Sequence, residues 1–162
     1  MRDWVSEWKQ EGRIFVWRYA EPNRSWRGWH FTADQAGCRS IRNLLDRMRG
    51  GEPCYRTLNL APITDAILSV PNYGHKTDGK FTKLRIAFEP DAADLRLSPI
   101  GETLEMTVGN ARLRLLSAAF SDVENGIGDF GVSPSDSRKA DPWMFWWIRT
   151  LTPPDNGKDR QI

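Results

Sequence analysis

Residues 143–148 read Trp-Met-Phe-Trp-Trp-Ile, an apolar run that is hydrophobic at every position. Successive side chains of a β-strand point to opposite faces of the sheet, so the run divides into two sets. These sets are Trp143, Phe145 and Trp147 on one face, and Met144, Trp146 and Ile148 on the other. A strand that is apolar on both faces is typical of the middle of a sheet covered on both sides. The run therefore predicts a central, buried strand.

The eight Trp residues are concentrated near the two ends of the chain. Five lie in the first thirty residues, and the other three belong to the run at 143–148. Trp carries a large apolar area, and its indole N–H needs a partner when it is buried. Because segments with the same unusual composition often share a core, we expect the two ends to meet in space. The five early residues are Trp4, Trp8, Trp17, Trp26 and Trp29.

The clearest helix is predicted at about 34–49, where apolar residues recur at helical spacing and Gly50 and Gly51 follow. Thr32 or Asp34 can cap its first turn. Its apolar stripe consists of Cys38, Ile41, Leu44, Leu45 and Met48, and its other face carries Arg39, Arg42, Asn43, Asp46, Arg47 and Arg49. Arg42 and Asp46 form an expected i,i+4 ion pair. A second, short helix is predicted at about 63–70, before Pro71.

Most other segments predict strands. Residues 13–20 and 26–32 are rich in branched and aromatic side chains and flank a turn, so they predict a hairpin. Residues 81–88 alternate between apolar and polar side chains, as expected of a half-buried strand. Further strands are predicted at 55–60, 95–98 and 103–108.

Two glycine-containing turns predict further hairpins. Gly109 and Asn110 fit a two-residue type II′ turn, which would place Met106 opposite Leu113 and Glu105 opposite Arg114. Residues 124–126 fit a three-residue loop with Gly126 in the left-handed conformation.

Together these segments predict an α+β fold. It is a mostly antiparallel, meander-rich sheet with the helix at about 34–49 packed on one face. Residues 1–150 form one expected domain, and residues 151–162 an expected flexible tail.

Several kinds of chemistry find no support in the residues. No apolar run is long enough to cross a membrane, and the N-terminal residues do not resemble a secretory signal, so a cytoplasmic protein without a membrane partner is expected. The two cysteines make no disulfide framework, and Cys38 is expected to be a core thiol. No cofactor motif and no metal-ligand spacing is present, so neither a cofactor nor a metal is predicted.

The remaining catalytic candidate is His75, in a polar segment that ends at Asp78. A histidine can exchange protons near neutral pH, and Asp78, Asp122 or Asp129 could orient it in a cleft. These residues predict, at most, an enzyme of unfamiliar type. The simpler interpretation of the segment is a polar loop before the turn at Asp78.

Binding is the other function that the residues indicate. Residues 1–60 carry 11 Lys and Arg against 7 Asp and Glu, a net +4, whereas the rest of the chain is at −2. The candidate binding residues are Arg24, Trp26, Arg27, Trp29, Arg39 and Arg42. Trp and Arg are enriched at protein interfaces, and basic residues among aromatic ones can also bind single-stranded nucleic acid. The alternative is a larger core in which Arg covers Trp rings.

The function predicted first is a non-enzymatic module that binds another protein through the Trp- and Arg-rich hairpin and the basic helix face. Its size and class are similar to those of small bacterial immunity proteins and inhibitors, an analogy that rests on no motif. An enzyme built on His75 is the first alternative, and a nucleic-acid-binding accessory protein is the second.

Overall fold

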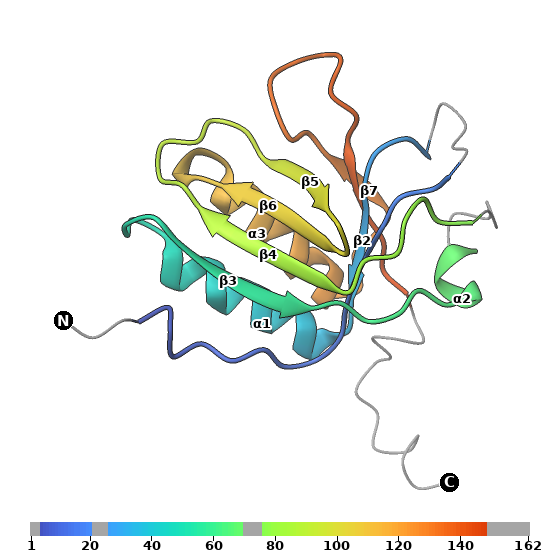
Figure 1. Cartoon of the computed structure of the whole chain (residues 1–162), viewed down its shortest axis with the longest axis horizontal. Helices are drawn as coiled ribbons and strands as arrows, with labels where there is room; N and C mark the ends of the chain where they lie inside the picture. Colours follow the sequence, from blue (N-terminus) through green and yellow to red (C-terminus); the bar gives the residue numbers. More distant parts are fainter. Residues whose placement is uncertain (1–3, 21–25, 70–75, 149–162) are drawn as a thin grey trace, which may run out of the picture.

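The computed structural model describes residues 4–20, 26–69 and 76–148 (Figure 1). The expected tail at 151–162 lies outside these residues. The elements, in chain order, are β1 (Ile14–Trp17), β2 (His30–Ala33), α1 (Gln35–Met48), β3 (Cys54–Asn59), α2 (Asp65–Leu68), β4 (Lys83–Phe88), β5 (Arg96–Ile100), β6 (Thr103–Val108), α3 (Asn110–Glu124), β7 (Phe130–Val132) and β8 (Trp143–Phe145).

The α+β class is confirmed, but the strands form two sheets instead of one. One sheet has the order β1-β2-β8-β7 and the other β3-β4-β6-β5. Neighbours in each sheet are antiparallel except for β2 with β8 and β4 with β6, which are parallel. In Figure 1, α1 and α3 lie behind the second sheet. The antiparallel prediction therefore holds in part, because each sheet contains one parallel pair that a simple meander would not produce.

The prediction of a central strand at the Trp-rich run is confirmed for residues 143–145, which form β8, whereas residues 146–148 lie beyond the end of that strand. β8 lies between β2 and β7, with Trp143 and Phe145 buried and Met144 half-buried. Trp143 and Phe145 join the main core, which fills the space between the two long helices and both sheets. Trp146 belongs to a second cluster on the opposite face, together with Phe15 and Trp17 of β1. The two Trp-rich ends of the chain therefore meet in space, as predicted.

The helix predicted at 34–49 is also confirmed, and the residues of its apolar stripe are all buried. Asp34 is the N-cap, and its Oδ1 atom accepts hydrogen bonds from the backbone N–H of Gly37 at 2.8 Å and of Arg13 at 2.9 Å. Asp34 therefore caps α1 and also ties the helix to the residue that precedes β1. The predicted short helix is present as α2, with Thr64 as its N-cap.

Replacement of Asp34 by Ala is expected to lower the free energy of unfolding by about 1–2 kcal/mol. The variant loses the cap of α1 and leaves two backbone N–H groups without this acceptor. Urea denaturation followed by circular dichroism measures the change. Asp34→Asn keeps an acceptor oxygen and should lose less than half as much. Equal losses in the two variants would contradict the capping role.

The hairpin predicted at Gly109 and Asn110 is wrong, because Gly109 is the N-cap of the long helix α3. Leu113 therefore packs from a helix, and Arg85 of β4 is the neighbour of Glu105 in the sheet. A Cβ atom on Gly109 would lie 2.4 Å from the carbonyl oxygen of Ala92, so this glycine is required by a close backbone approach. Gly126 has the predicted left-handed conformation, with a φ of 80°, but it follows the end of α3 instead of joining two strands.

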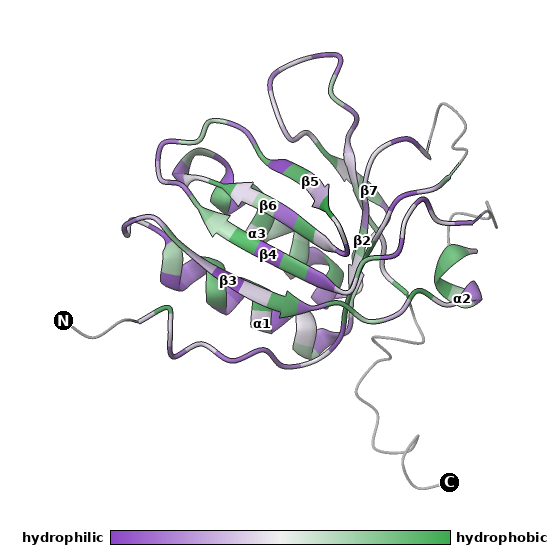
Figure 2. Ribbon diagram, in the orientation of Figure 1, coloured by the Kyte–Doolittle hydropathy of each residue, from purple (hydrophilic) through white to green (hydrophobic). Residues whose placement is uncertain are grey.

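The second sheet has one covered face and one open face. Leu84, Ile86 and Phe88 of β4 are buried in the main core, whereas Lys83 lies on the open face. Figure 2 shows this alternation as bands of hydrophobic and hydrophilic residues along β4. Within the described part of the chain, no helix is long and apolar enough to cross a membrane.

Candidate functional site

A groove of about 390 Å³ lies between α1 and α3, which pack against each other. Its wall on α1 includes three of the charged residues of the basic face predicted for that helix. The lining residues are Arg42 and Asp46 of α1, Arg49 at the C-cap of α1, and Leu113, Arg114, Ser117, Ala118 and Ser121 of α3. The groove is therefore formed by two elements, one of which the sequence analysis did not predict.

The arginines around this groove outnumber the carboxylates that neutralise them. Glu124 of α3 forms a close ion pair with Arg42, and its second oxygen lies 3.7 Å from Nη1 of Arg39. Arg49 pairs with Asp46 at 2.9 Å. Arg114 is exposed and forms no ion pair with any described residue. Three guanidinium groups thus share two carboxylates and that of Arg114 has none, so the groove and its surroundings carry a net positive charge.

The predicted ion pair between Arg42 and Asp46 is wrong. Arg42 turns toward Glu124 instead, and Asp46 pairs with Arg49 one turn along the helix. Glu124 has only 14% of its side chain exposed, so this partner is less screened by solvent than Asp46 would be. The spacing within α1 could not show this choice, because the competing carboxylate comes from α3.

The two candidate Trp residues of the hairpin, Trp26 and Trp29, are half-buried and buried, respectively. Trp29 is only 7% exposed, with the guanidinium of Arg18 4.6 Å from its ring centroid and Phe81 packed against its edge. Trp26 is half-buried and packs on Trp146 with ring centroids 5.3 Å apart. Arg27 is exposed. The indoles of this hairpin therefore contribute mainly to the core, as the alternative interpretation proposed.

Arg24, another candidate binding residue, lies outside the described residues. Trp4 is 56% exposed, more than the other large hydrophobic residues near it. The guanidinium of Arg47 lies 4.3 Å from the Trp4 ring centroid, and its Nη1 donates to the Trp4 carbonyl oxygen. Arg47 is thereby directed to the N-terminal segment and away from the groove.

His30 occupies a buried aromatic cluster that the sequence analysis missed. Its ring is stacked between Trp17 and Trp146, with centroid distances of 5.5 Å and 6.0 Å. Nε2 lies 3.0 Å from the carbonyl oxygen of Trp26, and the indole N–H of Trp146 donates to Nδ1 at 3.0 Å. Because Nδ1 accepts, the proton of the neutral ring is on Nε2. Burial lowers the pKa of His30 to about 4, against an ordinary value of 6.5.

Two of the candidate catalytic carboxylates, Asp78 and Asp129, lie at opposite edges of one sheet. Asp78 pairs with Arg18 at 3.1 Å, just beyond the end of β1. Asp129 precedes β7 and accepts a hydrogen bond from the backbone N–H of Trp147 at 3.4 Å. β1 and β7 are the two outer strands of one sheet, so three strand spacings, roughly 14 Å, separate these edges. Asp122 lies in the last turn of α3, and His75 lies outside the described residues.

The two cysteines differ in their surroundings. Cys38 is fully buried in the main core, and burial raises the pKa of its thiol to about 12. Burial disfavours the thiolate form of Cys38, in agreement with the predicted core thiol. Cys54 is half-buried at the start of β3.

Arg114 is the residue of the groove that the sequence analysis assigned to the wrong element. The signal that could have placed it is the spacing of Leu113, Leu116, Phe120 and Val123, which recur every three or four residues as on a helix.

Comparison of the chain with protein-family models, with curated proteins and with solved structures found no significant match.

Proposed function

We propose that this chain is a non-enzymatic module that binds an acidic segment of another protein in the groove between α1 and α3. The observation that carries the proposal is the excess of arginine there: Arg42, Arg49 and Arg114 line the groove, and Arg114 has no carboxylate partner among the described residues. A partner that supplies carboxylates would complete this set of ion pairs.

The residue types of the groove suit such a partner. A guanidinium group binds a carboxylate with two parallel hydrogen bonds, which gives direction as well as attraction. Arg is also enriched at protein interfaces, where it often carries a large share of the binding energy. The hydroxyl groups of Ser117 and Ser121, which line the α3 side, add further donors for carboxylate or backbone oxygens. A role like that of an immunity protein or inhibitor, in which the bound partner is neutralised, would use this same groove.

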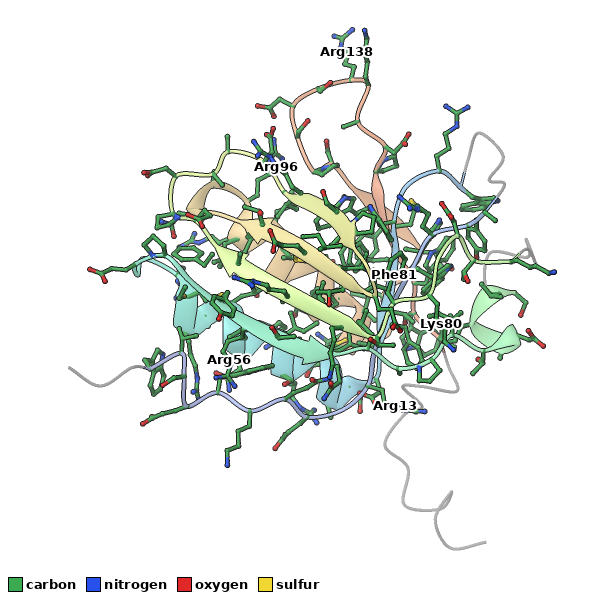
Figure 3. All side chains as sticks on the ribbon, in the orientation of Figure 1. Arg13, Arg56, Lys80, Phe81, Arg96 and Arg138 are labelled. Atoms are coloured by element: carbon green, nitrogen blue, oxygen red, sulfur yellow. The ribbon has the colours of Figure 1, made fainter. Side chains whose placement is uncertain are left out.

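The fluorescence anisotropy of a labelled ten-residue polyglutamate peptide tests the proposal. The double variant Arg49→Gln/Arg114→Gln is expected to weaken binding roughly fivefold or more, since it removes two exposed charges from the groove. The matched control is Arg138→Gln/Lys139→Gln, which removes the same charge from the loop between β7 and β8, where Figure 3 shows Arg138 at the periphery. The control should bind within twofold of the unaltered protein.

Two outcomes would contradict the proposal. Equal weakening in both double variants would mean that the peptide responds only to net charge. Tighter binding of a labelled dT12 oligonucleotide, lost in the groove variant and steeply dependent on salt, would favour a nucleic-acid partner instead.

A further inference from the structure

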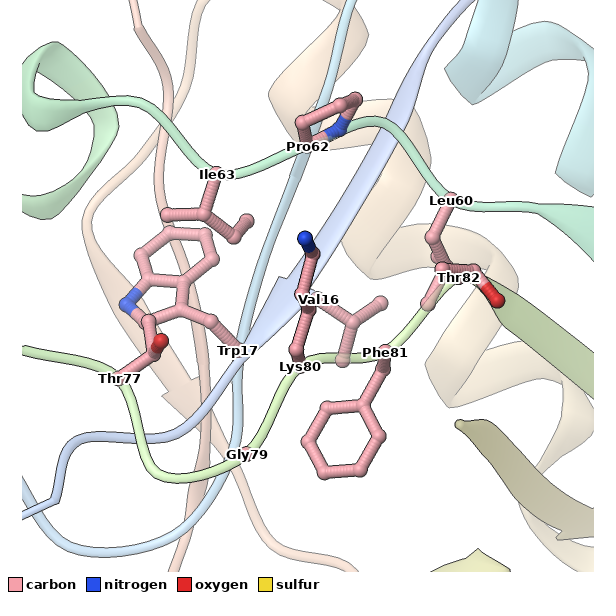
Figure 4. A pocket seen from close by; sticks show the side chains of 10 residues that line it. All are labelled: Val16, Trp17, Leu60, Pro62, Ile63, Thr77, Gly79, Lys80, Phe81 and Thr82. Carbon is pink, nitrogen blue, oxygen red and sulfur yellow. The ribbon is translucent and has the colours of Figure 1, made fainter. Parts of the chain in front are cut away.

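A second cavity, lined mainly by apolar residues, lies where β1 meets the segment that follows β3 and the segment that precedes β4 (Figure 4). Its volume of about 340 Å³ is within the range of small-molecule sites. Val16 and Trp17 of β1 and Leu60 form a buried floor, and Ile63 and Phe81 are half-buried walls. The exposed rim consists of Pro62, Gly79, Lys80 and Thr82. An apolar group could therefore enter from the rim and rest on an apolar floor.

Lys80 gives this pocket its charge. It is the one charged residue among the described residues that line the pocket, and it forms no ion pair with any of the described carboxylates. Figure 4 shows its ammonium group extending over the pocket toward Pro62 and Ile63. A ligand lying on the apolar floor would thus have an unpaired cation at its side.

Trp17, in the floor of the pocket, adds a second polar feature. Its indole N–H is buried and has no hydrogen-bond partner within the described ranges. Figure 4 shows this nitrogen on the side of Thr77, whose hydroxyl group also lines the pocket. Buried donors are normally paired, because an unpaired one costs free energy. The polar groups of this pocket therefore favour an occupant with acceptor atoms over a plain hydrocarbon.

We propose that the pocket binds a small monocarboxylic acid with an apolar body. The body would lie against Leu60, Ile63 and Phe81, and the carboxylate would pair with the ammonium group of Lys80. Phosphate groups are usually held by arginine forks or by several backbone N–H groups, whereas the described lining offers a single ammonium cation. One negative charge on a largely apolar molecule fits this combination.

Isothermal titration calorimetry with 4-phenylbutyrate and 4-phenylbutan-1-ol tests the class of ligand, since the two share an apolar body and differ in charge. The acid is expected to bind with a Kd below about 1 mM and the alcohol at least about tenfold more weakly. Equal binding of acid and alcohol would overturn the assigned role of Lys80. Absence of binding by both, or binding of inorganic phosphate as tight as that of the acid, would overturn the proposal.

Two variants and one control variant locate the binding site. Lys80→Met keeps an unbranched apolar side chain and should weaken binding of the acid about tenfold or more without changing that of the alcohol. Lys139→Met removes the same charge from the loop between β7 and β8 and should have no effect. Ile63→Trp fills the pocket and should abolish binding of both compounds while the circular dichroism spectrum stays unchanged. Undiminished binding in Ile63→Trp would show that the ligand lies elsewhere.

Discussion

Phe145→Ala is expected to lower the free energy of unfolding by about 3–5 kcal/mol, the range typical of large aromatic residues removed from a core. Phe145 is fully buried in β8, the central strand of its sheet. Its ring is stacked on Phe31 at 4.9 Å and on Phe130 at 5.7 Å, and Phe120 of α3 meets it edge-on at 5.3 Å. The substitution therefore leaves a cavity where two neighbouring strands and a helix meet.

Guanidinium chloride denaturation at neutral pH measures this loss. Tyr55→Ala is a suitable control, because Tyr55 is an aromatic strand residue of similar size that is 54% exposed on the other sheet. The control should lose less than about 1 kcal/mol, mainly through its contact with Arg85. Similar losses in the two variants would mean that β8 is not the centre of the core.

The second large effect concerns pH and His30. The pKa of this residue is lowered from 6.5 to about 4 because the folded protein buries the ring in its neutral form. The unfolded chain therefore binds a proton more readily than the folded chain at pH values between about 4 and 6.5. The contribution of neutral His30 to the free energy of unfolding is present in full above pH 6.5 and is lost as the pH falls toward 4. At about 1.4 kcal/mol per pKa unit, the loss is roughly 3 kcal/mol.

Urea denaturation at several pH values between 7.5 and 4 measures this dependence. Carboxylates also begin to titrate near the lower end, so the comparison is with His30→Gln, which lacks the titrating group and keeps all the carboxylates. The variant is expected to be less stable at pH 7.5 and to approach the unaltered protein as the pH falls. Parallel curves for the two proteins would contradict the neutral, buried state of His30.

Elements with an unambiguous local pattern could be predicted from the residues alone. The helix at 34–49 has a capping residue, an apolar stripe at helical spacing and two glycines after it, and all three signals agree with the structure. The first half of the run at 143–148 was placed correctly inside a sheet, because a strand with two apolar faces needs cover on both sides, but the strand ends at Phe145.

α3 was missed because its first residues satisfy two local rules at once. Gly109 and Asn110 fit a tight hairpin turn, and the residues after them also alternate well enough to resemble a strand. In the structure Gly109 begins a helix and lies close to the Ala92 carbonyl oxygen. That contact joins residues 17 positions apart, so the local sequence does not reveal it. The loss of this helix from the prediction also removed half of the arginine groove.

The candidate sites depended on tertiary structure to a greater degree. Arg39 and Arg42 were recognised as a basic helix face, but Glu124 and Arg114, which determine the charge around them, come from α3. Trp29 was selected as a binding residue, and the structure buries it beneath Arg18. Lys80 and Trp17 carry no local signal for a common pocket, because they are brought together from segments more than sixty positions apart.

By itself, the sequence determined the α+β class, the main helix, the central strand and the meeting of the two Trp-rich ends. The first three follow from the periodicity of apolar side chains, which a chain must bury wherever the segment lies, and the last follows from the Trp content of the two ends. Only the tertiary structure decided the division into two sheets, the parallel pairs, the neutral state of His30 and the lining of the groove and the pocket. These depend on which distant segments become neighbours, and that choice is set by packing of the whole chain.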